Sequence, residues 1–243
     1  MSTTCKLHDT GLRLVRWIGV EDVAALQRAA VERIVGAATP AIERRGQFLI
    51  VLAGGNTPQN IYRALRGVDT DWSRWHVYFG DERCLPGDDP ERNSRMAADA
   101  WLDHVFIPHN QIHPLPAELG PERAARDYLE TLRDVGDFDL VLLGLGEDGH
   151  TASLFPDRDW GVASNAPDVL AVLDAPKPPP QRVTLSATRL SRARAVLFLV
   201  AGETKLEAVR LWQEGADIPA RAIRPSAGVD VLLESKLLAE RIG

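Results

Sequence analysis

Seven short apolar runs punctuate the chain, and longer segments with helical periodicity lie between them. Several runs, such as FLIVL at 48–52 and AVLFLV at 195–200, are apolar at almost every position instead of alternating. A strand of this kind is covered on both faces, as in a parallel sheet. The sequence therefore predicts an α/β fold: a mostly parallel, doubly wound sheet with helices on both faces and ligands at the carboxyl ends of its strands.

The pattern of runs also predicts where the elements lie. The other expected strands are 12–17, 75–79, 138–143, 182–186 and 229–233. The expected helices are 21–35, 121–134, 204–212 and 234–241. No internal repeat or break in composition divides the 243 residues, so we expect a single domain, 1–243.

Charge and cysteine content disfavour several classes of protein. The formal net charge is −6, and no lysine- or arginine-rich run offsets it, which argues against nucleic acid or an anionic membrane as the main partner. Cys5 and Cys84 show neither metal-ligand spacing nor a disulfide framework. No segment approaches 18 uninterrupted apolar residues, and the N-terminus lacks a secretory apolar region. We expect a cytoplasmic protein without a metal.

The stretch GLGEDGHTASLFP at 144–156 follows an expected strand and supports two interpretations. Gly144, Gly146 and Gly149 fit the G-x-G-x-x-G fingerprint of dinucleotide-binding proteins, and Asp168 lies at the distance expected of a ribose-binding acid. That fingerprint requires a helix to begin at its third glycine. Because a proline follows seven residues later and no helical stripe appears, the nucleotide interpretation is disfavoured.

The alternative interpretation centres on His150, with Asp148 two residues before it on a glycine-flanked turn. An imidazole with a carboxylate nearby can take up and return a proton near neutral pH. The other histidines are expected to be structural or exposed. Thr151 and Ser153 are interpreted as caps of a following helical turn.

A second glycine turn, LAGGNTPQ at 52–59, follows the strand at 48–52. Gly54 and Gly55 free the backbone to aim N–H groups at an anion, and Asn56 or Thr57 can cap the following helix or donate to phosphate oxygens. A plain strand-to-helix turn is the alternative.

Charged residues follow two further strands. Asp81, Glu82 and Arg83 come directly after 75–79, where they can orient a base or bind a sugar phosphate, or form a solvated loop. Lys205 lies in the first turn expected of a helix, where a cation is unfavourable unless an anion is present, although a surface lysine is the alternative. The proline-rich segment 175–182 is a stiff spacer that can hold Lys177 and Arg182 over a site.

These motifs in this order resemble the 6-phosphogluconolactonases of the pentose phosphate pathway. The resemblance rests on FDLVLLGLGEDGHTASLFP, with AGGNTP, FGDERCLPGDDPERN, PKPPPQRVTLS and AGETK in support. It implies a Rossmann-like fold and hydrolysis of 6-phospho-D-glucono-1,5-lactone to 6-phosphogluconate without metal, nucleotide or other cofactor.

By the same resemblance His150 is the catalytic base, and Asp81 and Arg83 are active-site residues. The AGGNTP loop (Gly54, Gly55, Asn56 and Thr57), Arg182 and Lys205 hold the phosphate. The family often has serine at the position of Asn56, and of its S-N-Y motif only Asn93 matches.

Several alternatives stay open at this point. Asp148 or Asp81 can fix the imidazole tautomer, and Arg83 or backbone N–H groups near Gly146 can stabilise an oxyanion. A glucosamine-6-phosphate isomerase/deaminase and a non-catalytic sugar-phosphate sensor are the rival functions. The expected partner is a small sugar-phosphate lactone, and the chain is expected to be a monomer or small homo-oligomer.

Overall fold

A central sheet of eight strands forms the core of the computed structural model, which describes residues 4–8 and 14–238. The strand order is β1-β2-β11-β10-β7-β3-β4-β6, with β1 antiparallel to β2 and the remaining neighbours parallel. Its strands are β1 (Thr4–His8), β2 (Val15–Val20), β3 (Phe48–Leu52), β4 (Trp75–Phe79), β6 (Ile112–His113), β7 (Leu140–Gly144), β10 (Val196–Val200) and β11 (Val229–Glu234). The predicted doubly wound, mostly parallel sheet is confirmed.

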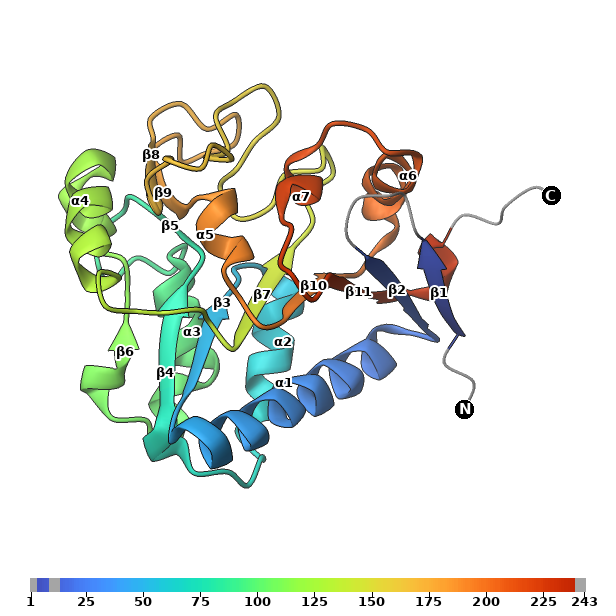
Figure 1. Ribbon diagram of the computed structural model, residues 1–243. Coiled ribbons are helices and arrows are strands. Elements are labelled where there is room, and N and C mark those ends of the chain that lie inside the picture. Colours follow the sequence, from blue (N-terminus) through green and yellow to red (C-terminus); the bar gives the residue numbers. More distant parts are fainter. Residues whose placement is uncertain (1–3, 9–13, 239–243) are drawn as a thin grey trace.

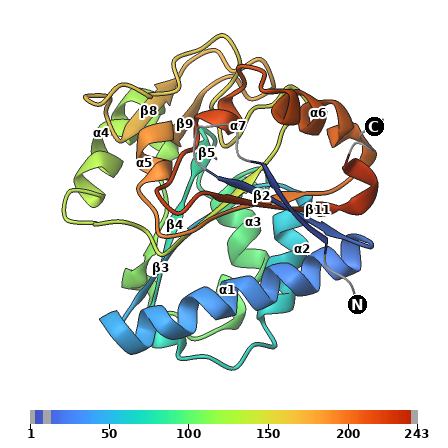
Figure 2. The same ribbon diagram turned by 45° about the vertical axis from the view of Figure 1, so that its right-hand side comes forward.

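Helices cover the sheet from both sides (Figures 1 and 2). In both views α1, α2 and α3 lie on one side, and α5, α6 and α7 lie on the other. The helices are α1 (Val23–Arg45), α2 (Asn56–Leu65), α3 (Asn93–Ala100), α4 (Pro121–Thr131), α5 (Ala187–Ser191), α6 (Leu206–Glu214) and α7 (Pro219–Ala222).

A second, three-stranded sheet lies beyond the carboxyl edge of the main one. It pairs β5 (Asp81–Arg83), β9 (Arg182–Leu185) and β8 (Val169–Val172), all antiparallel. The strand expected at 182–186 is present as β9, but it belongs to this second sheet and not to the main, mostly parallel one. An apolar run shows that a strand is covered but not which sheet it joins, and here Gly80 bends the chain leaving β4 so that β5 pairs with β9.

Helix α1 ends ten residues beyond the end of the predicted helix, 21–35. Asp22 caps its start by accepting the N–H of Ala25 at 2.7 Å, and Gly46 ends it with φ of 74°. Beyond the predicted end, Ala38 and Ala41 continue the buried stripe, and this packing carries the helix past an internal proline.

Two other helix predictions needed correction. A 3-10 turn, Glu203–Lys205, precedes α6, so Lys205 caps that helix instead of lying in its first turn. The segment 234–241 was expected to be helical, but its first residue ends β11 and a 3-10 turn, Ser235–Leu237, follows. Residues 239–241 lie outside the described part of the chain.

The strand order places a topological switch point between β3 and β7. From β3 the chain continues outward through β4 to β6, whereas from β7 it continues the opposite way through β10 to β11. The loops that leave β3 and β7 therefore diverge, which opens a crevice at their carboxyl ends.

The side chain of Asp139, just before β7, contacts three other segments of the chain. This side chain, 3% exposed, accepts the N–H of Leu49 at 2.9 Å and pairs with Arg45 and Arg194.

We predict that Asp139→Ala lowers the free energy of unfolding by about 2–3 kcal/mol, because a buried N–H and two arginines lose their acceptor. Urea denaturation measures the loss. The matched control, Glu207→Ala, removes an exposed ion pair and should leave the midpoint nearly unchanged.

Candidate active site

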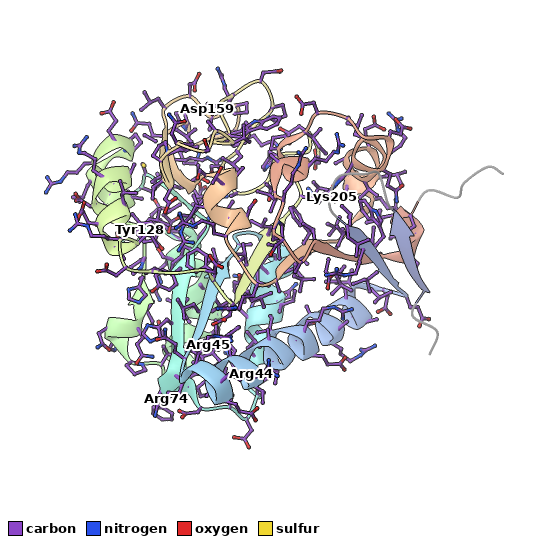
Figure 3. All side chains as sticks on the ribbon, viewed as in Figure 1. Arg44, Arg45, Arg74, Tyr128, Asp159 and Lys205 are labelled. Atoms are coloured by element: carbon purple, nitrogen blue, oxygen red, sulfur yellow. The ribbon has the colours of Figure 1, made fainter. Side chains whose placement is uncertain are left out.

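A cavity opens at the switch point, at the carboxyl ends of β3, β4, β7 and β10. Seven of the residues predicted from sequence line it: Gly54, Gly55, Asp81, Arg83, His150, Arg182 and Lys205. Figure 3 shows Lys205 near the start of α6, at this end of the sheet. Segments far apart in sequence thus meet in one small crevice, which is where a doubly wound sheet binds ligands.

The loop after β7 is shaped around His150. Gly146 donates its N–H to the carbonyl of His150 at 2.7 Å, and Gly149 adopts a φ of +83°. A Cβ at Gly146 would lie 1.9 Å from His150 Nδ1, so the ring packs directly on the glycine backbone. Residues 145–168, all within the described part, contain no helix, which removes the nucleotide interpretation.

Asp148 is the carboxylate that touches the imidazole. Its Oδ1 lies at His150 Nδ1 and also accepts the His150 N–H at 3.3 Å. Phe155 packs against the ring with centroids 4.9 Å apart. An Nδ1–H tautomer is favoured by this contact, and Nε2 is then the nitrogen that can accept a proton.

The electrostatics keep this pair as a neutral imidazole beside an ionised carboxylate. Burial lowers the pKa of His150 below its ordinary value, Asp148 opposes that shift, and the charge of Lys177 adds to it. Burial alone would raise the pKa of Asp148. The hydrogen bonds from His150 and the charge of its protonated ring outweigh burial, so the pKa of Asp148 is lowered.

Asp81 is buried, and two donors hold its carboxylate. Asn93 Nδ2 lies 3.1 Å from Oδ1, and Ser153 Oγ lies 2.5 Å from Oδ2. We expected Ser153 to cap a helical turn, but its hydroxyl donates to Asp81 instead. Sequence reasoning also assigned no role to Asn93, because the 12 residues that separate it from Asp81 give no local signal.

The two neighbours of Asp81 have different surroundings. Glu82 is fully buried and accepts the N–H groups of Asn93 and Ser94 at the start of α3, and it pairs with Arg92. It supports the fold and does not line the cavity. Arg83 does line the cavity. Its Nη1 donates to the carbonyl of Glu91 at 2.6 Å, and its buried Nε has no partner among the described residues.

The glycine turn after β3 presents backbone to the cavity. Gly55, with φ of +102°, is the N-cap of α2 and makes no side-chain cap, so neither Asn56 nor Thr57 caps this helix. Only Gly54 and Gly55 of the predicted phosphate loop line the cavity. Asn56 is exposed and Thr57 half-buried. The helix N-terminus nonetheless aims partial positive charge at the crevice.

Two cations, Arg182 and Lys205, also line the cavity. Arg182 is 6% exposed and donates to the carbonyls of Lys177, Pro178 and Pro179 at 3.1–3.2 Å, so it anchors the proline-rich segment as well as lining the cavity. Burial lowers the pKa of Lys205, and the charge of Lys177 adds to that effect. The two lysines are therefore near enough to repel each other.

Across residues 4–8 and 14–238, no group of three histidine, cysteine or acidic side chains is arranged to hold a metal ion. Nor does that part of the chain contain a helix of sufficient length and apolarity to span a bilayer.

Fold and site together define a doubly wound α/β protein with a histidine–carboxylate pair in a cation-lined crevice. The chain belongs to the family described as glucosamine-6-phosphate isomerases/6-phosphogluconolactonase, whose model matches residues 21–232. It is 41% identical over 210 residues to the 6-phosphogluconolactonase of Mycobacterium tuberculosis, covering 81% of this chain and 85% of that one.

Two further relatives agree. The 6-phosphogluconolactonase of Synechocystis is 43% identical over 211 residues, with 82% of this chain and 86% of that one covered. The crystal structure of 6-phosphogluconolactonase from Thermotoga maritima superposes with a TM-score of 0.82 at 28% identity, over 90% of this chain and 98% of that one.

The charges around His150 predict how its titration shifts in variants. Asp148→Asn should lower the pKa of His150 further, because Asp148 raises it, whereas Lys177→Gln should raise it, because Lys177 lowers it. NMR titration of the imidazole measures both. Lys236→Gln, which removes an exposed lysine paired with Glu203 and Glu234, is the control and should leave the titration unchanged. Shifts of equal sign in the Asp148 and Lys177 variants would contradict the assignment.

Proposed function

We propose that the protein hydrolyses 6-phospho-D-glucono-1,5-lactone to 6-phosphogluconate. The observation that carries the proposal is a neutral imidazole, held at Nδ1 by Asp148, at the floor of a cavity lined by Arg83, Arg182 and Lys205. The reaction needs a base near a reactive carbonyl and cations for a phosphate, and the cavity contains both. The names of the relatives at about 40% identity support the same substrate.

In the proposed mechanism, Nε2 of His150 removes a proton from a water molecule as the water oxygen attacks C1 of the lactone. The imidazolium that forms is stabilised by Asp148 across Nδ1. When the tetrahedral intermediate collapses, the bond from C1 to the ring oxygen breaks. The imidazolium returns its proton to that oxygen, which leaves a hydroxyl group and the free acid.

Arg83 is the better of the two oxyanion donors that we considered. The N–H of Gly146 already donates to the carbonyl of His150 at 2.7 Å, whereas Arg83 lines the cavity and carries a full positive charge. A guanidinium that lines the cavity can stabilise the negative charge that develops on the carbonyl oxygen.

The phosphate is assigned to the cations of the cavity and to the glycine turn after β3. Arg182, Lys205 and the N–H groups of the Gly54–Gly55 turn at the start of α2 supply positive charge there. We no longer give the side chains of Asn56 and Thr57 a direct role, since neither lines the cavity. A cytoplasmic location and a monomer or small homo-oligomer stay predictions from the sequence.

Removing the imidazole tests the proposal directly. His150→Ala should lower kcat by about 10²- to 10⁴-fold, the contribution of a positioned general base, with little change in affinity for 6-phosphogluconate. Acid release from freshly generated lactone, corrected for spontaneous hydrolysis, gives the rate. The control His104→Ala removes an exposed histidine and should retain activity. Turnover by the His150 variant at the wild-type rate would refute the role of the base, and ammonia release from glucosamine 6-phosphate without lactone hydrolysis would establish the deaminase.

The pH dependence follows from the lowered pKa of His150. Because the neutral ring is the base, kcat/KM should be constant above its pKa and fall as pH drops through that value. Burial places the value below 6.5, so the acidic limb should lie below pH 6.5. In Lys177→Gln the limb should move to higher pH. Rates are again corrected for spontaneous hydrolysis at each pH, and an acidic limb centred above 7 would contradict the assignment.

A further inference from the structure

Asn93, the first residue of α3, lies directly against the glycine turn after β3. A Cβ added to Gly54 would come within 2.0 Å of Asn93 Oδ1 and 2.5 Å of its Cγ. Asn93 is 5% exposed and is one of the residues that line the cavity. The close approach is possible only because Gly54 has no side chain, and it fixes the turn relative to the start of α3.

The same amide continues to the loop that carries the base. Asn93 Nδ2 donates to the carbonyl oxygen of Asp81 at 2.9 Å and to its Oδ1 at 3.1 Å. The other carboxylate oxygen of Asp81 accepts from Ser153 Oγ at 2.5 Å, and Ser153 lies three residues after His150. Buried contacts thus run from Gly54 through Asn93, Asp81 and Ser153 to the loop of His150.

This chain of contacts joins two loops that line the cavity. One is the turn assigned to the phosphate, and the other is the loop that carries the imidazole. Since each link is buried and made by a short side chain or by backbone, the chain has little freedom to stretch. It sets the separation between the phosphate turn and Nε2 of His150.

We infer that Asn93 is a specificity-determining positioning residue, which fixes the span between the phosphate turn and His150 so that only a lactone with a phosphate at the matching distance is held for attack. The inference rests on the proposed function. Asn93 does not need to touch the reacting atoms. A misplacement of about 1 Å between a binding group and a reacting group can cost on the order of 10²-fold in rate.

The test compares two lactones in one enzyme. 6-Phosphogluconolactone can contact both the phosphate turn and His150, whereas glucono-1,5-lactone has no phosphate and does not depend on the separation between them. Asn93→Ala should lower the ratio of kcat/KM for the phosphorylated over the plain lactone by about 10-fold or more. Activity toward the plain lactone should change much less. A role in stability alone would lower both rates together and leave the ratio unchanged.

Gly54→Ala supplies a second, independent perturbation that leaves the Asn93 side chain in place. Its new Cβ must push the Asn93 amide aside, so it should reduce the same ratio. In the double variant Gly54→Ala/Asn93→Ala the clashing atoms are gone. The second substitution should therefore cost little or partly restore the ratio, giving a clear departure from additivity. If the added Cβ acted only by blocking the phosphate, Gly54→Ala would lower the ratio equally in the wild type and in Asn93→Ala.

Ser94→Ala is the matched control, because it removes a half-buried hydroxyl next to Asn93 that donates to Glu82 at 2.6 Å and not to Asp81. It should leave the ratio unchanged, and thermal unfolding reports the folded fraction of every variant. If Asn93→Ala does not fold, Ser153→Ala carries the test, because it breaks the same chain of contacts at Asp81 Oδ2 and adds no atom near the phosphate turn. Unchanged ratios in the folded variants, or strictly additive losses in the double variant, would overturn the inference. Absence of lactone hydrolysis in the wild type would instead refute the proposed function.

Discussion

The divergence of the chain between β3 and β7 is the constraint on which the site depends. Parallel strands bring their carboxyl ends to one edge, and the loops after β3 and β7 turn away from each other there. The glycine turn at Gly54, the strand end at Asp81 and the loop of His150 consequently face one crevice, although they are up to 96 positions apart in the chain. A sheet without this switch would close that space with side chains.

The shape of the crevice depends on two glycines as well as on its charged side chains. At Gly146 a Cβ would occupy the position of the His150 ring, and at Gly54 it would occupy that of the Asn93 amide. Neither glycine is required for a left-handed backbone, since positive φ in these two loops falls on Gly55, Gly149 and Ala152. Each loop therefore combines one glycine that bends the chain with another that admits a neighbouring polar group.

The apolar runs could be predicted from sequence because strands covered on both faces have few other compositions, and the site loops followed from the polar residues at their ends. The second sheet could not, since the pattern of Arg182–Leu185 is that of any buried strand. The Asn93 and Ser153 contacts to Asp81 were missed for a different reason. They join positions 12 and 72 residues apart, and their hydrogen bonds depend on how α3 and the His150 loop are placed in space.

Under the proposed function, the cations of the site act on the base as well as on the anionic substrate. Three donor contacts of Arg182 hold the carbonyls of Lys177, Pro178 and Pro179, and this brings Lys177 near enough to lower the pKa of both His150 and Lys205. In a chain of net charge −6, an anionic substrate must be attracted by such a local concentration of positive charge. Burial keeps the imidazole neutral and the charge of Lys177 adds to that effect, while Asp148 keeps the ring oriented. Under the proposed function, phosphate recognition and base strength therefore share the charge of Lys177.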